Sequence, residues 1–199
     1  MSDLLTNWGY SIENTASLPD LMTVAEFNTL TGNKFVNDTR VSSLLASAQT
    51  SIRNFCGWHL FPELPCKLEA DSINVSRCVQ VPSRFVTSYT SVTINNESVL
   101  DFHGKTNGLL FLDGSVLGKS WNDVVVRFNS GLGASQMGAI KEILAGRIAN
   151  ALTNSYGVQS ESAGGVSITY SLNWASNASA TAITDPLIAA LAPYRVQEV

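Results

Sequence analysis

The sequence predicts an α+β fold, in which a small helical-bundle core carries an inserted antiparallel β subdomain between its two long helices. Two segments far apart in the chain repeat apolar residues at steps of three and four, which is the pattern of an amphipathic helix. Between these segments the apolar period changes to two, as in half-buried strands. Strands do not alternate with helices in the pattern, so we expect antiparallel pairing rather than a parallel sheet.

The first long helix is predicted over residues 38–58, and the rest of the fold is organised around it. Asn37, Asp38 or Thr39 can cap its start, and Gly57 can end it because glycine adopts a left-handed backbone easily. One apolar stripe runs along this helix and needs a partner to cover it. The stripe consists of Val41, Leu44, Leu45, Ala48, Ile52, Phe55 and Cys56.

The second long helix, over residues 137–156, is the predicted partner, and Gly157 closes it. Its stripe consists of Ile140, Ile143, Leu144, Ile148, Ala151 and Leu152.

Two shorter helices are also predicted. Thr23 and Glu26 have the spacing of a capping box, so we expect a helix over residues 23–31 that ends at Gly32. A second one covers residues 184–191 and ends at Pro193, since proline cannot continue a helix.

Residues 67–128 read as short antiparallel strands and hairpins. Val124, Val126 and Phe128 alternate with polar residues, and Asn95-Asn96 can form a tight turn because asparagine tolerates positive φ. A further strand pair is expected around Gly164-Gly165.

The predicted organisation has three parts. Residues 1–22 form an N-terminal extension, either loosely attached or ordered as a contact arm. Residues 23–66 and 130–199 form the helical core with a C-terminal strand and tail, and residues 67–129 form the inserted β subdomain.

Composition excludes several classes of protein. The net charge is −4, and the basic residues are scattered from Lys34 to Arg195, which argues against binding DNA or anionic membranes through phosphate contacts. The apolar runs are too short to span a membrane, and we expect no signal peptide. Three cysteines cannot all pair within the chain, so reduced thiols and synthesis in a cytoplasm are the simplest interpretation.

No catalytic, cofactor-binding or metal-binding residues are expected. His59 and His103 are the two imidazoles, and neither lies in a recognisable catalytic motif, so surface or loop positions are predicted for both. A small zinc protein or enzyme remains an alternative, because the chain offers Cys56, His59, Cys66 and Cys78 as ligands. Their spacing matches no familiar zinc module.

Large side chains in polar segments are the better candidates for function. Aromatic residues and arginine are enriched at protein interfaces, and packing within the chain is the alternative for each. We expect truncation after Leu191, or Arg195→Ala, to leave a folded chain with weaker partner binding. The predicted interface residues are Trp8, Tyr170, Trp174, Tyr194 and Arg195.

Several segments, taken in order, resemble the head-to-tail adaptor family (head-completion or connector proteins) of tailed bacteriophages. The resemblance spans residues 23–195, and the N-terminal extension departs from it. It rests on the helix ending IRNFCGW (52–58), VTSYTSVTI (86–94), GLLFL (108–112), Trp121, VVVRFNSG (124–131), SESAGGVSITYS (160–171) and LAPYR (191–195).

The resemblance implies a structural virion protein of the neck. Such adaptors form a ring, usually twelvefold, that binds the portal protein and presents a platform to stopper or tail proteins. The ring lengthens the channel through which genomic DNA passes without sequence-specific binding. A stopper or a tail terminator is the alternative from the same particle, and those proteins are expected to lack the paired long helices.

Overall fold

The computed structural model confirms an α+β protein with antiparallel sheets. It describes residues 3–72, 78–112, 122–153, 160–163, 166–169 and 189–196. The chain forms two compact units, which we call the sheet unit and the helical unit. The sheet unit comprises Met1–Leu21, Arg53–Met137 and Tyr194–Val199, and the helical unit comprises Met22–Ile52 and Gly138–Pro193.

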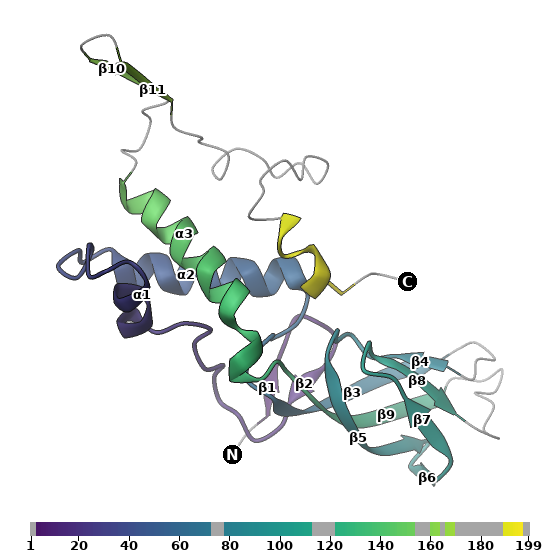
Figure 1. Cartoon of the computed structure of the whole chain (residues 1–199). Helices are drawn as coiled ribbons and strands as arrows, with labels where there is room; N and C mark the ends of the chain where they lie inside the picture. The colour runs from purple at the N-terminus through teal and green to yellow at the C-terminus, as the bar shows by residue number, and fades with distance from the viewer. Residues whose placement is uncertain are drawn as a thin grey trace. The chain divides into compact units, whose positions relative to one another are not determined.

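A six-stranded antiparallel sheet forms the centre of the sheet unit (Figure 1). Its two longest pairings join β3 to β9 and β9 to β5, so β9 is its central strand. In the order β1-β2-β3-β9-β5-β6, the strands are Leu4–Leu5, Ser11–Ile12, Leu64–Ser72, Asn122–Ser130, Val86–Ile94 and Glu97–Val99.

The predicted alternation and the predicted turn are both confirmed in this sheet. Val124, Val126 and Phe128 point to one face of β9 and are buried, as a period of two requires. Asn95 and Asn96 have φ values of 50° and 66° and close the hairpin in which Ile94 pairs with Glu97. The conformation with two positive φ angles suits the twist of the two strands.

A smaller three-stranded sheet completes this unit, in the order β4-β8-β7. Tyr89 of β5 fills the space left by the missing side chain of Gly104, where a Cβ atom would lie 1.9 Å from the Tyr89 ring. The two sheets therefore approach each other closely at this point. The strands are Cys78–Gln80 (β4), Leu109–Leu112 (β8) and Phe102–Gly104 (β7).

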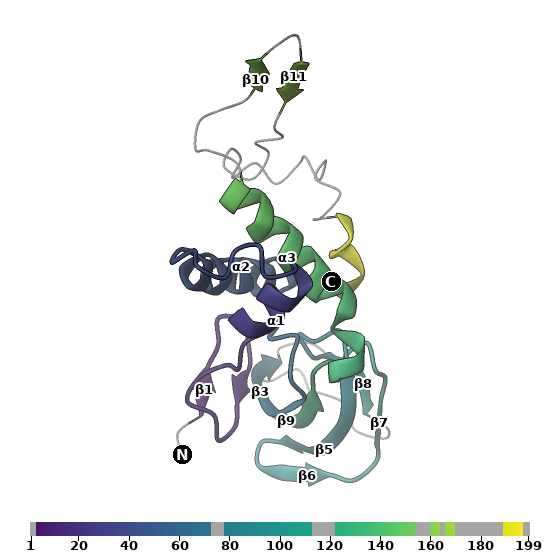
Figure 2. The ribbon, with the colours of Figure 1, turned by 60° about the vertical axis from the view of Figure 1, so that its left-hand side comes forward.

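The helical unit contains α1 (Val24–Leu30), the part of α2 (Val41–Cys56) up to Ile52, and α3 (Gly138–Thr153). The predicted capping box of α1 is confirmed, and Glu26 also binds Lys141 of α3, with 2.5 Å between the carboxylate oxygen and Nζ. Figure 2 shows α1 and α3 from a second side. The predicted arrangement of the helices as a bundle stays a prediction.

Most residues of the two predicted apolar stripes are buried, whereas Leu44, Ala48 and Phe55 of α2 and Ala151 of α3 are only half-buried. On α2, Val41, Leu45, Ile52 and Cys56 are buried, and Gly57 ends the helix with a φ of 76°. The buried residues of α3 are Ile140, Ile143, Leu144, Ala145, Ile148 and Leu152.

Of the two alternatives for the N-terminal extension, loose attachment is wrong, and a role as a contact arm stays a prediction. Strand β2 pairs with β3, so Ser11 lies opposite Lys67 and Ile12 opposite Cys66. The Ile12 side chain is completely buried, and Tyr10 is 4% exposed. This segment belongs to the sheet unit because its few apolar side chains complete the core there.

Other differences are smaller. Strand β3 begins at Leu64, three residues before the predicted start of the strand region at residue 67. Pro193 lies inside the short 3-10 helix η2 (Ala192–Tyr194). The predicted strand pair near Gly164-Gly165 is confirmed as β10 (Ser160–Ala163) and β11 (Val166–Thr169), which pair antiparallel. Gly157 and most of the predicted helix over 184–191 lie outside the described residues.

Candidate interaction surfaces

The C-terminal tail, residues 194–196, contains two of the predicted interface residues, Tyr194 and Arg195. The Trp58 Nε1–H donates to the Tyr194 carbonyl over 2.6 Å, and the Val196 N–H donates to the Cys56 carbonyl over 2.9 Å. The second bond satisfies one of the carbonyls left unpaired at the end of a helix. The tail is therefore fastened to the last turn of α2 within the sheet unit.

The Arg195 side chain is the exposed part of this tail. Its guanidinium carbon lies 5.4 Å from the centre of the Phe55 ring, a cation–π contact, and the side chain is exposed. Tyr194 is half-buried. Truncation after Leu191 would remove contacts within the fold as well as any contact with a partner, so it cannot separate these two effects.

Trp8 lies apart from that pair in the N-terminal segment. Its ring centre is 6.3 Å from that of Tyr10, and its Nε1–H is buried without a hydrogen-bond partner. Among the described residues, no hydrogen bond or ring contact joins Trp8 to Tyr194 or Arg195. Tyr170 and Trp174, the other two predicted interface residues, lie outside the described residues.

A buried polar cluster was missed in the sequence, and it corrects the prediction that His59 lies at the surface. His59 is completely buried. Its Nε2 lies 2.9 Å from the Ser130 carbonyl and 3.0 Å from the Pro62 carbonyl, so this nitrogen carries the proton. Nδ1 then accepts from the Tyr10 hydroxyl over 2.8 Å, and the same hydroxyl accepts from the His59 backbone N–H over 3.1 Å.

Burial keeps this histidine neutral. Desolvation lowers the pKa of His59 to about 4, and the nearby Arg53 acts in the same direction, while the Ser130 and Pro62 carbonyls oppose it. Burial also raises the pKa of Tyr10, so its hydroxyl stays protonated. The cluster thus joins the N-terminal segment to the segment after α2 through uncharged hydrogen bonds.

Arg53 supports the same region from the last turn of α2. Its guanidinium donates to the carbonyls of His59 over 3.0 Å and Pro19 over 2.5 Å. Burial lowers the pKa of Arg53, and the charge of Asp20 opposes that shift. The sequence does contain a signal of this role. Gln49 and Arg53 are polar residues one turn apart on the helix face that carries the apolar stripe, so their side chains point into the protein and need hydrogen-bond partners there.

The cysteines do not form a ligand cluster with His59. Burial raises the pKa of both Cys56 and Cys66 to about 12. Within the described part of the chain, no group of three or more His, Cys, Asp or Glu side chains could hold a metal ion. In the same residues, no helix is long and apolar enough to cross a membrane.

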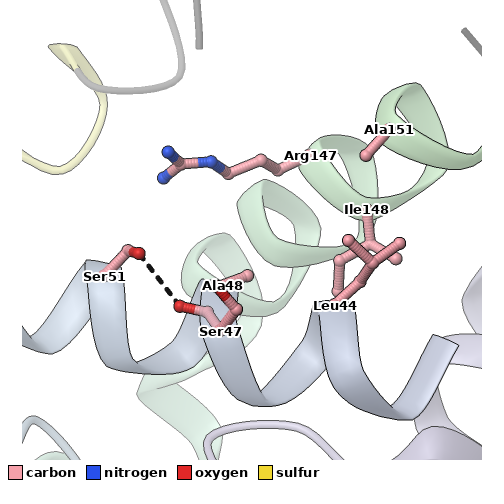
Figure 3. A pocket seen from close by; sticks show the side chains of 7 residues that line it. All are labelled: Leu44, Ser47, Ala48, Ser51, Arg147, Ile148 and Ala151. Atoms are coloured by element: carbon pink, nitrogen blue, oxygen red, sulfur yellow. Dashed lines mark hydrogen bonds between the residues drawn. The ribbon is translucent and has the colours of Figure 1, made fainter. Parts of the chain in front are cut away.

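A groove runs between α2 and α3 in the helical unit. Leu44, Ala48, Ile148 and Ala151 supply apolar walls, while Arg147 extends from α3 on the side where Ser51 lies (Figure 3). Ser47 also lines the groove and accepts from the Ser51 hydroxyl through its carbonyl over 2.9 Å. Small side chains at 48 and 151 leave the space open.

No protein-family model and no curated protein matches the sequence. A chain of the solved structure "Neck of empty GTA particle computed with C6 symmetry" matches with a TM-score of 0.58 and 16% identity, over 94% of this chain and 96% of that chain. A chain of "Neck of native GTA particle computed with C12 symmetry" matches with a TM-score of 0.51 and 14% identity, over 92% and 97%. GTA denotes a gene transfer agent, which is a phage-like particle.

The chain shares the fold of one chain in each of these two neck structures. At this identity the likeness shows the fold alone, and it covers nearly the whole of each chain.

Proposed function

We propose that this chain is a head-to-tail adaptor in the neck of a tailed phage or phage-like particle. In this role it forms a ring, twelvefold in our proposal, that binds the portal protein and carries stopper or tail proteins. The observation that carries the proposal is the fold shared with chains of two GTA neck structures. The sixfold and twelvefold symmetry named for those necks supports a ring.

The role is structural rather than catalytic. Genomic DNA passes through the ring without sequence-specific binding, and the net charge of −4 suits a channel that must release DNA. The protein is made in the host cytoplasm and ends in the virion neck.

The two long helices favour an adaptor over a stopper or a tail terminator. Both α2 and α3 are 16 residues long. We expect a stopper or terminator to be dominated by β structure, without such a pair.

Quantitative mass spectrometry of purified particles tests the role. We expect about one copy of this chain per portal subunit, as rings of matched symmetry require. Cross-linking mass spectrometry on the same particles should then join this chain to portal. Absence from particles would refute the virion role, whereas cross-links to tail-tube protein without any to portal would favour a terminator.

A further inference from the structure

The surface around α1 leaves apolar side chains uncovered. Five large hydrophobic residues of the described chain are exposed, and three of them lie between residues 24 and 36: Val24, Leu30 and Val36, which are 41%, 52% and 57% exposed. Val24 and Leu30 lie one turn before and one turn after Phe27, on either side of it along one face of the helix. Phe27 is buried and stacks on Phe35, with 6.0 Å between the ring centres. Apolar side chains that gather in this way mark interaction sites.

Lys34 adds a cation to this surface. Its side chain is exposed, and Nζ lies 5.4 Å from the centre of the Phe35 ring. That contact uses the charge of the ammonium and leaves its N–H donors available. Within the described residues, the Lys34 side chain makes no hydrogen bond or ion pair. A partner that matches this α1 surface (Val24, Leu30, Lys34, Phe35 and Val36) therefore presents an apolar side chain next to a carboxylate.

The turn between β6 and β7 presents this combination in the sheet unit. Leu100 is 87% exposed, the largest exposed fraction among the large hydrophobic residues of the described chain. Asp101, the next residue, and Glu97 of β6 are exposed too, and within the described residues neither carboxylate has a hydrogen bond or an ion pair. A single exposed leucine is ordinary on a protein surface. The adjacent carboxylate without a partner makes this one distinctive.

The other exposed large hydrophobic residue of the sheet unit lacks such a carboxylate. Near Leu5, the carboxylate of Asp3 accepts a hydrogen bond from the Asn14 backbone N–H over 3.1 Å. Leu100 with Asp101 is therefore the better match for the α1 surface.

The cations close to the α1 surface, apart from Lys34, already bind carboxylates of their own unit. Arg40 binds Asp38 over 2.7 Å, and Lys141 binds Glu26 of α1. Among the described residues, Lys34 is thus the cation of this surface that a carboxylate from another chain can meet.

We propose that the β6–β7 tip, Leu100 with Asp101, docks on the α1 surface of the next copy of this chain. The contact rests on the ring proposed above, which supplies that second copy. Leu100 covers the exposed side chains of Leu30 and Val36, and the Lys34 ammonium donates to the Asp101 carboxylate. The tip belongs to the sheet unit and the α1 surface to the helical unit. Because they are different surfaces of one chain, each copy uses both, and the contact repeats around a closed ring.

Cross-linking of purified wild-type particles with a carbodiimide tests the ion pair. This reagent joins an amine directly to a carboxylate that touches it, so peptide mass spectrometry should find Lys34 bonded to Asp101. Lys34 bonded to a carboxylate of portal would assign the α1 surface to portal and overturn the contact. Lys34 without a bond to any carboxylate would overturn it as well.

Disulfide cross-linking shows whether the contact joins two copies. The particles carry the chain with Leu100→Cys and Val36→Cys, with Cys78→Ser to remove the partly exposed thiol. Oxidation is expected to give a ladder of covalent multimers of this chain. Two matched controls should give none: Leu5→Cys in place of Leu100→Cys, and Thr50→Cys in place of Val36→Cys. Leu5 is 85% exposed, and Thr50 is an exposed residue of the helical unit.

A ladder of equal strength in the controls, a bond within one chain, or no disulfide would each overturn the docking. The wild-type particles separate the two proposals. Wild type present at the portal ratio without a bond between Lys34 and Asp101 refutes the docking alone, whereas wild type absent from particles refutes both.

Charge reversal gives an independent measurement. Asp101→Lys and Lys34→Asp should each lower the copies incorporated per portal by about fivefold, because each places like charges together. The double variant should recover most of the wild-type number, since the pair is restored with opposite orientation. Lys105→Asp is the matched control and should be incorporated like wild type: Lys105 is also exposed, and its Nζ also lies 5.4 Å from a ring centre, that of Phe111.

A double variant that melts like wild type but is incorporated as poorly as the single variants would overturn the pairing. So would an equal loss in Lys105→Asp, because any reversed lysine would then have the same effect. If a variant melts early, the cross-linking results decide.

Discussion

The N-terminal extension was predicted to be loosely attached or a contact arm, and the C-terminal tail was predicted to carry interface residues. Both ends are fastened to the sheet unit, by different means. The N-terminal segment adds strand β2 to the sheet and buries Tyr10 and Ile12. The C-terminal tail adds hydrogen bonds at the end of α2 and one cation–π contact, with Arg195 exposed. Apolar burial stabilises by about 25 cal/mol per Å², so the buried side chains of the N-terminal segment contribute to the core. The C-terminal tail is held mainly by hydrogen bonds at the surface.

This difference helps to tell residues that stabilise the fold from residues that can bind a partner. A side chain in the core is already occupied within its own chain and is not available to a partner. The Arg195 side chain is exposed, so of the described predicted interface residues it is the one best placed to meet a partner.

The largest expected effect comes from breaking the N-terminal attachment. Ile12→Ala removes a completely buried side chain, and we expect a loss of about 3 kcal/mol in unfolding free energy, since cavities in a core are not filled by relaxation. Leu5→Ala in the neighbouring edge strand is the control, with almost no loss, because Leu5 is 85% exposed. Urea unfolding measures both. Equal losses would mean that burial in this segment does not matter.

Acid should weaken the same attachment through His59. The folded pKa is about 4, against an ordinary value of 6.5. Between these values the unfolded chain binds the proton and the folded chain does not, so stability is complete above pH 6.5 and falls as the pH drops toward 4. The loss approaches about 3 kcal/mol.

Urea unfolding across this pH range measures that slope. His59→Gln should flatten it, although the variant starts less stable, whereas His103→Gln should keep it because His103 is exposed. An unchanged slope in His59→Gln would assign the acid sensitivity to other groups.

Removing the C-terminal tail should have an intermediate effect. Truncation after Pro193 leaves the Trp58 Nε1–H without the Tyr194 carbonyl and the Cys56 carbonyl without the Val196 N–H. We expect a loss of about 2 kcal/mol, because a buried donor that loses its partner retains its desolvation penalty. Thermal unfolding with and without the tail measures it. No change in melting would show that these two hydrogen bonds do not stabilise the fold.

Arg195→Ala should have the smallest effect on stability, less than about 1 kcal/mol, since the cation–π contact with Phe55 is exposed. Its effect on assembly should be larger: the folded variant is expected to bind portal more weakly. Arg84→Ala, at another exposed arginine, serves as the control in a portal pull-down. Equal binding by both variants would remove Arg195 from the interface.

Local patterns in the sequence predicted much of the fold correctly. The stripes of α2 and α3, the capping box at Thr23 and the turn at Asn95-Asn96 all depend on residues a few positions apart. Such features are set by backbone geometry and capping within one segment. The candidate interface was predicted less well, because exposure of an aromatic residue depends on what other segments cover it.

The sequence by itself determined the α+β class, the long helices and the hairpins, since helix and strand periods are written in neighbouring residues. Only the tertiary structure decided that residues 4–5 and 11–12 pair within a sheet, that His59 is buried between Tyr10 and Ser130, and that the tail fastens to α2. Each of these joins residues far apart in the chain. Such contacts form when the fold brings strand edges, hydrogen-bond donors and carbonyls from distant segments together, and a local sequence pattern cannot predict them.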